Sequence, residues 1–445
     1  MNKVNPKIFK SYDIRGIYPE ELDEPASYLI GRAYAKAMED HEIVVGSDTR
    51  LSSPALKKAF IEGVTTEGKD VIDIGVVPID AVYFAVGILK YPAGAVITAS
   101  HNPKEYNGFK LPYKNAGWMR GLELLELVRS LPEQTAKKKG KVRQVDIMPK
   151  YIKHILSFVD PKKIKPFNVV VDAGNGLAGK VMPLLERHLP LKMIKLNFEL
   201  DGNFPGHPSN PLLAESRTQI IAAIKKNQAD FGVIFDGDTD RLIFYDEKTN
   251  FIPADLTLLV LAREFLKREP GSTIVYNAIC SRVVREKVTE WGGQAVRAKV
   301  GFINVREKMR EVDGIVSGEL SSHYSFRDND YADSGFIAFL ILLQLLSEDN
   351  RPLSEIIEEF QKYYKADETN IEVKDQNAII EKVKEKYADG KQDELDGLTV
   401  EYKDWWFNVR PSNTEPLLRI TVEANTRDLL KQKHQEIINF IDQVK

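Results

Sequence analysis

The stretch FNVVVDAGNGLAGKVMPLLERHL (167–189), followed by LKMIKLN (191–197), decides the fold. Its first apolar run is rich in Val and ends at Asp and Gly, as a buried strand of a parallel or mixed sheet does. The residues after the turn follow the pattern of an amphipathic helix, and a second apolar run comes next. The stretch therefore predicts a strand–helix–strand unit.

The same order of elements occurs twice more. HEIVVGSDTRLSSPALKKAFIEG (41–63) leads to KDVIDIG (69–75), and a third unit spans STIVYNAICSRVVREKVTEWGGQAVRAK (272–299). A recurrence every roughly 100–130 residues indicates three related α/β units rather than a short-period solenoid.

The C-terminal part has a different pattern. It carries the strand-like runs KDWWFNVR (403–410) and LLRITVEA (417–424), which indicate a smaller α+β domain. Two polar segments mark connections, QTAKKKGKVRQ (134–144) and YDEKTN (245–250). The fold class is therefore α/β, and we expect four domains, at 1–140, 141–250, 251–360 and 361–445.

Composition excludes several classes of protein. The net charge of −3 argues against a nucleic-acid protein, whose affinity comes largely from a basic surplus. It is compatible with small anionic substrates, which local donor clusters bind. No apolar run approaches the ~18 residues of a membrane span, and the N-terminus has no secretory pattern. Cys280 is the single cysteine, so no internal disulfide can form. We expect a cytoplasmic protein.

The segment AGAVITASHNPKEYNGFK (93–110) follows an apolar strand with Ser100, His101, Asn102 and Lys110. Ser, Asn and Pro also form ordinary polar turns, so a turn without chemistry stays open on this segment alone. The chemical interpretation is a serine nucleophile at a strand end, with His101 and Lys110 as acid, base or phosphate contact. The surrounding residues lack the G-x-S-x-G pattern of a hydrolase.

The segment FGVIFDGDTDRLIFYD (231–246) places Asp236, Asp238 and Asp240 on one tight loop, with Arg241 next. Crowded carboxylates repel one another unless a cation lies among them. Oxygen ligands favour magnesium or calcium, so we predict a metal site rather than a solvated acidic turn. An EF-hand is excluded because Arg241 replaces the glycine that its sixth position requires.

The glycines of VVVDAGNGLAGKV (169–181) admit two nucleotide-binding interpretations. Gly174, Gly176 and Gly179 match the dinucleotide fingerprint, and the same letters resemble a P-loop. Val181 stands where a P-loop needs a hydroxyl, and a single glycine fingerprint is weak. We favour a tight strand-to-helix turn whose glycines allow close packing.

Two further loops have compositions suited to ligands, although each could be an ordinary polar turn. SGELSSHYSFRD (317–328) could bind sugar hydroxyls through Glu319, Ser321 and His323. VRPSNTEPLLRI (409–420) offers the donors that a phosphate needs. These donors are on Arg410, Ser412, Asn413 and Thr414.

Six motifs arriving in order resemble the α-D-phosphohexomutase family, specifically its bacterial phosphomannomutase/phosphoglucomutase members. They are FKSYDIRG (9–16), TASHNP (98–103) with NGFK (107–110), DGNFPGHPSNP (201–211), DGDTDR (236–241), GELSSH (318–323) and RPSNTEP (410–416). The resemblance covers essentially the whole chain, and TASHNP followed by D-G-D-x-D-R is highly specific. It implies three related mixed α/β domains and a smaller fourth domain around a central cleft.

The resemblance also implies roles. Ser100 is the phosphoserine and, with Asp236, Asp238 and Asp240, holds Mg²⁺. Phosphoryl transfer or its acid–base chemistry is linked to Arg15, His101, Lys110 and Arg241. Glu319, Ser321 and His323 contact the sugar. The phosphate that does not react is bound by one loop, through Arg410, Ser412, Asn413 and Thr414.

The implied reaction is the reversible interconversion of hexose 1-phosphate and hexose 6-phosphate, with hexose 1,6-bisphosphate as intermediate and activator. We expect phosphohexose substrates, no nucleic-acid or membrane partner, and a monomer or small homo-oligomer. Two alternatives stay open: a phosphoglucosamine or phospho-N-acetylglucosamine mutase, and a protein that binds NAD or ATP through its glycines.

Three positions depart from the family pattern. Phe302 stands where relatives often place a histidine, and Leu320 is unusual in the sugar loop. Near Ile279, relatives can carry a basic phosphate contact, for which Arg282 is a candidate replacement. These departures concern phosphate and sugar contacts of the third domain more than the chemistry.

Overall fold

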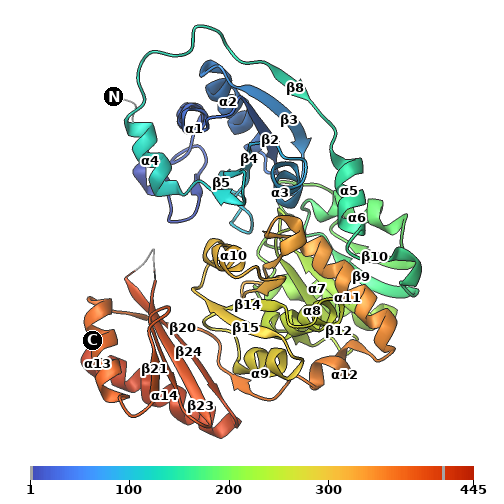
Figure 1. Cartoon of the computed structure of the whole chain (residues 1–445), viewed down its shortest axis with the longest axis vertical. Coiled ribbons are helices and arrows are strands. Elements are labelled where there is room, and N and C mark those ends of the chain that lie inside the picture. The colour runs from blue at the N-terminus through green and yellow to red at the C-terminus, as the bar shows by residue number, and fades with distance from the viewer. Residues whose placement is uncertain (1–3, 413–415) are drawn as a thin grey trace. The chain divides into compact units, whose positions relative to one another are not determined.

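The computed structural model describes residues 4–412 and 416–445. The chain forms two compact units, shown in Figure 1. The first unit contains the residues up to Pro253 together with Ser321–Ser354, and the second contains Ala254–Leu320 with Glu355–Lys445.

The first sheet of the first unit runs in the order β1-β5-β4-β2-β3-β8, and β6 and β7 extend it beside β4. Its strands are β1 (Ile14–Ile17), β2 (Glu42–Ser47), β3 (Asp70–Val76), β4 (Ala93–Ile97), β5 (Tyr106–Lys110), β6 (Pro112–Tyr113), β7 (Gly117–Trp118) and β8 (Val142–Gln144). The segment 134–144 is exposed except for the half-buried Gly140, as the sequence predicts, but its last residues add strand β8 parallel to β3.

Helices cover both faces of this sheet because its central strands are apolar throughout. Every residue of β4 is buried, as expected for a strand between two helical layers. Ile43 and Val45 of β2 share one hydrophobic cluster with helices α1 (Glu24–Ala37) and α2 (Ser53–Thr66). Helix α3 (Ile79–Gly87) packs on β2 and β4, and α4 (Gly121–Arg129) packs on α1.

The second sheet of the first unit runs in the order β10-β9-β11-β12-β13. Its strands are β9 (Phe167–Asp172), β10 (Leu191–Leu196), β11 (Phe231–Phe235), β12 (Leu242–Asp246) and β13 (Phe251–Ile252). Its helices are α5 (Met148–Leu156), α6 (Ala178–Glu186), α7 (Thr218–Asn227) and α11 (Gly335–Asp349). Helix α11 is apolar on nearly all sides and is correspondingly buried, packing on β12 and α5. The antiparallel pair β17 (Tyr324–Phe326) and β18 (Ala332–Asp333) also belongs to this unit.

The second unit begins with a third α/β arrangement. Strand β14 (Thr273–Asn277) pairs in parallel with both β15 (Gln294–Ala298) and β16 (Val316–Gly318). The helices are α8 (Ala254–Arg268), α9 (Arg282–Glu290) and α10 (Phe302–Glu311). Helix α12 (Leu353–Glu358) lies where the chain enters this unit for the second time.

The three stretches quoted from the sequence fold alike, which confirms the predicted relationship. In each, a helix connects two parallel strands: α2 joins β2 to β3, α6 joins β9 to β10, and α9 joins β14 to β15. The first strand of each unit also has a second parallel neighbour, which is β4, β11 or β16.

The C-terminal residues form the expected smaller α+β domain. Its sheet runs in the order β19-β24-β23-β22-β21, and β20 also pairs with β24. The strands are β19 (Tyr364–Lys365), β20 (Thr369–Glu372), β21 (Lys391–Asp393), β22 (Leu398–Glu401), β23 (Trp405–Pro411) and β24 (Leu417–Ala424). Helices α13 (Gln376–Lys386) and α14 (Arg427–Val444) share its hydrophobic cluster. Among the described residues, no helix has both the length and the apolar character needed to cross a bilayer.

Candidate active site

The predicted nucleophile and the predicted metal loop both follow the carboxyl end of a parallel strand. Ser100 comes after β4, and Asp236 comes directly after β11. Ligand sites of α/β sheets are typically found at this edge. Lys110, the last residue of β5, and Arg15, in β1, reach the same site from the antiparallel strands.

The three aspartates of the metal loop converge. Asp236, Asp238 and Asp240 are almost fully buried, and each has a carboxylate oxygen within 4.8 Å of those of the other two. Oδ1 of Asp238 is buried and accepts no hydrogen bond from the residues that the structure describes. An orphaned carboxylate oxygen among other carboxylates fits a hard divalent cation.

The ammonium of Lys110 bridges two of these carboxylates directly. Its Nζ donates to Oδ2 of Asp238 at 2.9 Å and to Oδ2 of Asp240 at 2.6 Å. Although burial disfavours its charge, the two carboxylates raise the pKa of Lys110 above its ordinary value. Burial, together with the charges of Asp240 and Asp238, raises the pKa of Asp236 well above its usual range. For Asp236, burial and the two neighbouring carboxylates outweigh the opposing charges of Arg241 and Lys110, so a further cation beside it would stabilise its ionised form.

Ser100 faces this acidic site. Its hydroxyl donates to Oδ2 of Asp236 at 2.8 Å, and the residue is 2% exposed. Its main chain has a positive φ of 51°, which is uncommon for a residue with a side chain. The Ser100 N–H donates to the Thr98 hydroxyl at 2.9 Å. Both bonds hold the serine hydroxyl toward the aspartates.

His101 belongs to the serine loop, which we define as residues 98–106, and Arg15 contacts this loop. Nδ1 of His101 is 3.2 Å from the Ser100 hydroxyl. Burial and the positive charges of Arg241 and Arg15 lower the pKa of His101 well below its ordinary value, so the ring is neutral near pH 7. Arg15 donates to the carbonyl of Ala99 at 3.4 Å.

The loop assigned to sugar recognition is divided between the two units, at Leu320 and Ser321. His323 lies beside the acidic site, with its Nε2 3.4 Å from Oδ1 of Asp240, and its Nδ1 is 2.8 Å from the Ser321 hydroxyl. Arg241 forms a main-chain β-bridge with His323, and its N–H points at Oδ1 of Asp236 at 3.3 Å. Ser321 and His323 thus join the aspartate site of the first unit.

The remaining predicted residues belong to the second unit. Glu319 is buried and accepts a hydrogen bond from the N–H of Gly301 at 2.9 Å. Arg410 pairs with Glu368 at 2.7 Å, and the same carboxylate faces Arg419 at 3.5 Å. Among the described residues, these two guanidinium groups share one carboxylate.

Ser412 is buried, and its N–H donates to the Leu417 carbonyl at 2.9 Å. Asn413 and Thr414 lie outside the described residues. Arg282, considered as a replacement phosphate contact, donates to the Lys403 carbonyl at 3.1 Å and lies over the Tyr363 ring at 5.1 Å, so protein groups engage it.

The glycine-rich segment packs closely against neighbouring backbone. A Cβ on Gly176 would lie 2.7 Å from the carbonyl oxygen of Gly237, and a Cβ on Gly179 would lie 2.2 Å from that of Phe198. Close packing therefore explains these glycines, as the sequence analysis favoured.

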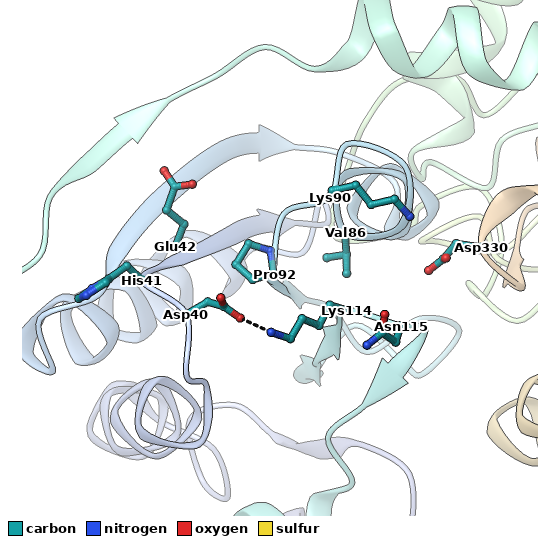
Figure 2. A pocket seen from close by; sticks show the side chains of 9 residues that line it. All are labelled: Asp40, His41, Glu42, Val86, Lys90, Pro92, Lys114, Asn115 and Asp330. Atoms are coloured by element: carbon teal, nitrogen blue, oxygen red, sulfur yellow. Dashed lines mark hydrogen bonds and ion pairs between the residues drawn. The ribbon is translucent and has the colours of Figure 1, made fainter.

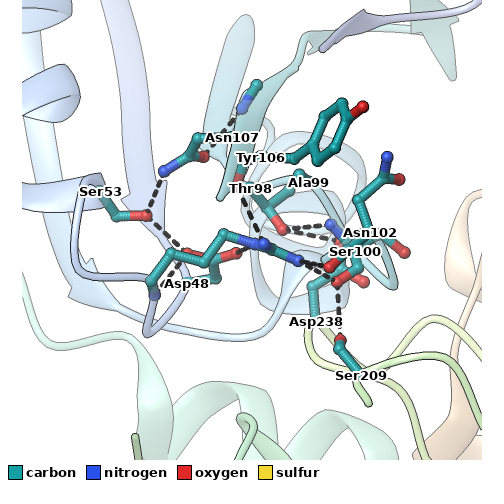
Figure 3. A network of polar contacts seen from close by, with 12 residues as sticks. Asp48, Ser53, Thr98, Ala99, Ser100, Asn102, Tyr106, Asn107, Ser209 and Asp238 are labelled. Carbon is teal, nitrogen blue, oxygen red and sulfur yellow. Dashed lines mark hydrogen bonds and ion pairs between the residues drawn. The ribbon is translucent and has the colours of Figure 1, made fainter. Parts of the chain in front are cut away.

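Sequence reasoning missed two residues that contact the serine loop, Arg50 and Ser209. Arg50 follows β2, which pairs in parallel with β4, so its position at the same sheet edge as Ser100 was the available signal. Figure 3 shows Ser209 and Asp238 beside Ser100, with Asp48 on the neighbouring loop.

A hollow of about 500 Å³ opens elsewhere on the first unit, as Figure 2 shows. An ion pair of 2.8 Å between Lys114 and Asp40 lies in it. Its lining contains acids and lysines but none of the predicted site residues: Asp40, His41, Glu42, Val86, Lys90, Pro92, Lys114, Asn115 and Asp330.

Comparison with known proteins identifies the family. The sequence matches four domains of the phosphoglucomutase/phosphomannomutase family: α/β/α domain I over residues 6–134, domain II over 149–249, domain III over 253–363 and the C-terminal domain over 368–440. A phosphomannomutase of Vibrio cholerae is 39% identical over 452 residues, covering 97% of this chain and 98% of that relative. A phosphomannomutase of Methanocaldococcus jannaschii is 38% identical, covering 98% of this chain and 97% of the relative.

A solved structure supports the same family. A phosphoglucomutase/phosphomannomutase family protein from Burkholderia thailandensis superposes with a TM-score of 0.91 at 31% identity, covering 99% of this chain and 98% of the other. The motifs, the acidic site beside Ser100 and these matches lead to one conclusion: the chain belongs to the phosphoglucomutase/phosphomannomutase family of phosphohexose mutases.

Proposed function

We propose that this enzyme interconverts the 1-phosphates and 6-phosphates of mannose and glucose, with Ser100 as the phosphoryl carrier. The observation that carries the proposal is the 2.8 Å hydrogen bond from the Ser100 hydroxyl to Asp236, within a buried group of three aspartates. A nucleophile beside a cation site is the arrangement that phosphoryl transfer needs, because its catalysis consists mainly of positioning and charge neutralisation.

We propose Mg²⁺ as the cation, held by Asp236, Asp238, Asp240 and an oxygen of Ser100. The fit rests on the orphaned Oδ1 of Asp238 and on a ligand set made only of oxygen atoms. When bound, the ion neutralises charge on the phosphoryl group and makes it more electrophilic.

The protein side chains divide the remaining tasks. His101 is 3.2 Å from the serine hydroxyl, and on this distance we assign it to proton transfer. Lys110 keeps its proton because its pKa is raised, so we assign it to charge balance rather than to general base catalysis. Arg15 and Arg241 add positive charge beside the serine loop, where the phosphoryl group develops negative charge.

The reaction has two balanced transfers. In the first, the bond between phosphorus and the Ser100 oxygen breaks and a bond from that phosphorus to the free hydroxyl oxygen of the sugar phosphate forms. The proton of that hydroxyl passes to the Ser100 oxygen, which becomes the serine hydroxyl. The product is hexose 1,6-bisphosphate, which also activates unphosphorylated enzyme. In the second, the bond between the other phosphorus and its sugar oxygen breaks, the Ser100 oxygen bonds that phosphorus and loses its proton, and the released sugar oxygen takes up a proton to become a hydroxyl.

Substrate contacts follow the sequence prediction. We assign sugar hydroxyls to Glu319, Ser321 and His323, and the phosphate that does not react to the loop from Arg410 to Thr414. The two guanidinium groups of Arg410 and Arg419 beside Glu368 support an anion at that loop. The proposed domains, 1–140, 141–250, 251–360 and 361–445, carry the serine, metal, sugar and phosphate loops in that order.

The test measures conversion of mannose 1-phosphate and glucose 1-phosphate with Mg²⁺ and a trace of hexose 1,6-bisphosphate. Wild-type protein should turn over both, and Ser100→Ala should not. Intact mass should show one added phosphate that Ser100→Ala lacks. The control is Ser157→Ala, since that serine is exposed and its hydroxyl donates to the carbonyl of His154 in the adjoining helix. Turnover undiminished in Ser100→Ala would refute the mechanism.

An amino-sugar mutase is the second candidate. The relatives of 38–39% identity are named phosphomannomutases, which favours the first assignment. A parallel assay with glucosamine and N-acetylglucosamine phosphates decides between them, and a clear preference for either amino sugar would replace our assignment.

A further inference from the structure

Arg50 is a buried arginine whose guanidinium group donates most of its hydrogen bonds to the serine loop. Arginine has five N–H donors. In Arg50, all five have an acceptor in the protein. One acceptor is the Asp48 carboxylate, 3.1 Å from Nε. The other four are main-chain carbonyls of a single loop, those of Ser100 (2.8 Å), Asn102 (2.7 Å), Pro103 (2.6 Å) and Tyr106 (2.9 Å).

A second segment, which contains Phe204 and Ser209, contacts both Arg50 and Ser100. The Arg50 guanidinium lies 5.1 Å from the centre of the Phe204 ring, a cation–π geometry. The Ser209 hydroxyl donates to the carbonyl oxygen of Ser100 at 3.0 Å (Figure 3). The Ser100 carbonyl is therefore held from two sides, by Arg50 and by Ser209.

These contacts have a direct effect on Ser100. Its φ of 51° lies in the left-handed region, which persists in a residue with a side chain only where surrounding contacts enforce it. Rotation of the peptide unit between Ser100 and His101 would break both hydrogen bonds to the Ser100 carbonyl oxygen. In the conformation that they hold, the Ser100 hydroxyl reaches Asp236.

We propose that Arg50 is a positioning residue for phosphoryl transfer, and that Ser209 assists it. Together they hold the Ser100 carbonyl so that its hydroxyl faces the aspartate site. This inference rests on the proposed function of Ser100. Arg50 acts through the serine loop and makes no proposed contact with substrate.

The main test is Arg50→Lys. Lysine keeps the positive charge but has a single ammonium in place of the planar fork, so it cannot bond four carbonyls and a carboxylate at once. A misplaced reacting group costs rate far more than affinity, so kcat should fall on the order of 10- to 100-fold, while KM stays within about threefold. The rate at which hexose 1,6-bisphosphate phosphorylates Ser100, followed by intact mass, should fall in parallel.

Two further variants make the test specific. Arg32 is also a buried arginine of the first unit, bound to Glu67 at 2.6 Å and to the Pro132 carbonyl at 2.8 Å. Arg32→Lys should lower the unfolding temperature and leave kcat unchanged. Ser209→Ala removes only the second bond to the Ser100 carbonyl, and it should lower kcat severalfold at constant KM. It tests the inference even if Arg50→Lys does not fold.

The outcomes separate this inference from the proposed function. Wild-type protein without mutase activity would contradict both. Active wild-type protein with kcat unchanged in Ser209→Ala, or in folded Arg50→Lys, would overturn the positioning role alone. A change confined to KM would overturn it as well, because it would indicate a substrate contact.

Discussion

The hydroxyl of Ser100 donates a 2.8 Å hydrogen bond to Oδ2 of Asp236, although 136 positions separate them in the sequence. The two residues follow strands of different sheets, β4 and β11. Their contact places the proposed nucleophile beside three buried carboxylates, so we expect the charges of this site to affect both metal binding and stability.

Asp238→Asn should weaken Mg²⁺ binding on the order of 10- to 100-fold, because it removes a charged ligand from the three-aspartate site. Isothermal titration calorimetry of metal-free protein measures the change. Asp246→Asn is the matched control, since Asp246 is also buried but lies at the opposite end of the same hairpin, where Asn250 donates to it. Equal Mg²⁺ affinity in wild type and Asp238→Asn would contradict the metal site.

Lys110→Met should destabilise metal-free protein by about 3 kcal/mol, because it leaves buried carboxylates without their bridging cation. Saturating Mg²⁺ should restore part of this loss by supplying positive charge. Urea unfolding with and without Mg²⁺ measures both effects. Lys114→Met removes an exposed pair with Asp40, and exposed pairs contribute little. A loss in Lys110→Met no larger than in Lys114→Met would refute the explanation.

Asp80 should make stability depend on pH. Burial raises its pKa to about 7 from 3.8, while hydrogen bonds from Tyr151 and Ser334 oppose the shift. Because the folded state holds this proton more tightly than the unfolded chain, the stabilisation is complete below the unfolded pKa. It is lost as pH rises from about 4 to about 7. At about 1.4 kcal/mol per pKa unit, the loss reaches at most ~4 kcal/mol.

Asp80→Asn has no titrating carboxyl at this position and should remove that dependence. In EDTA, the unfolding free energy of wild type relative to Asp80→Asn should fall between pH 5 and pH 8. Urea unfolding at both pH values measures it. A difference that does not change with pH would show that Asp80 titrates normally in the folded protein.

Arg410→Ala should raise KM for phosphosugars more than it lowers kcat, because the proposed contact is with the phosphate that does not react. Loss of one charged hydrogen-bond donor corresponds to a KM roughly tenfold higher or more. Steady-state kinetics at saturating Mg²⁺ test this. The control is Arg427→Ala, which removes an exposed arginine near Tyr364 at the start of α14. An unchanged KM in Arg410→Ala would exclude the contact.

Much of the fold could be predicted because local patterns encode it. The buried runs of Val and Ile in β9 and β14 appear as continuous apolar letters, and 254–268 has the length and periodicity of α8. The edge strand β8 was not predicted. Its three residues are all exposed, so they lack the apolar pattern that reveals a strand.

The candidate site was predictable in its parts but not in its assembly. Ser100 and Asp236 each came from a local motif, whereas the hydrogen bond between them depends on how two sheets pack. His323 was predicted to contact sugar, and only the fold places it 3.4 Å from Asp240. Separation in sequence gives no information on such distances.

The sequence by itself determined the three strand–helix–strand units, the acidic loop and the family motif around Ser100, since neighbouring residues carry each of these patterns. The tertiary structure alone decided that Arg50 bonds four carbonyls of the serine loop. Every residue has a carbonyl, so no residue type at the accepting positions identifies such an interaction. Only the packing of β2 beside β4 brings this guanidinium to the loop that holds Ser100 against Asp236.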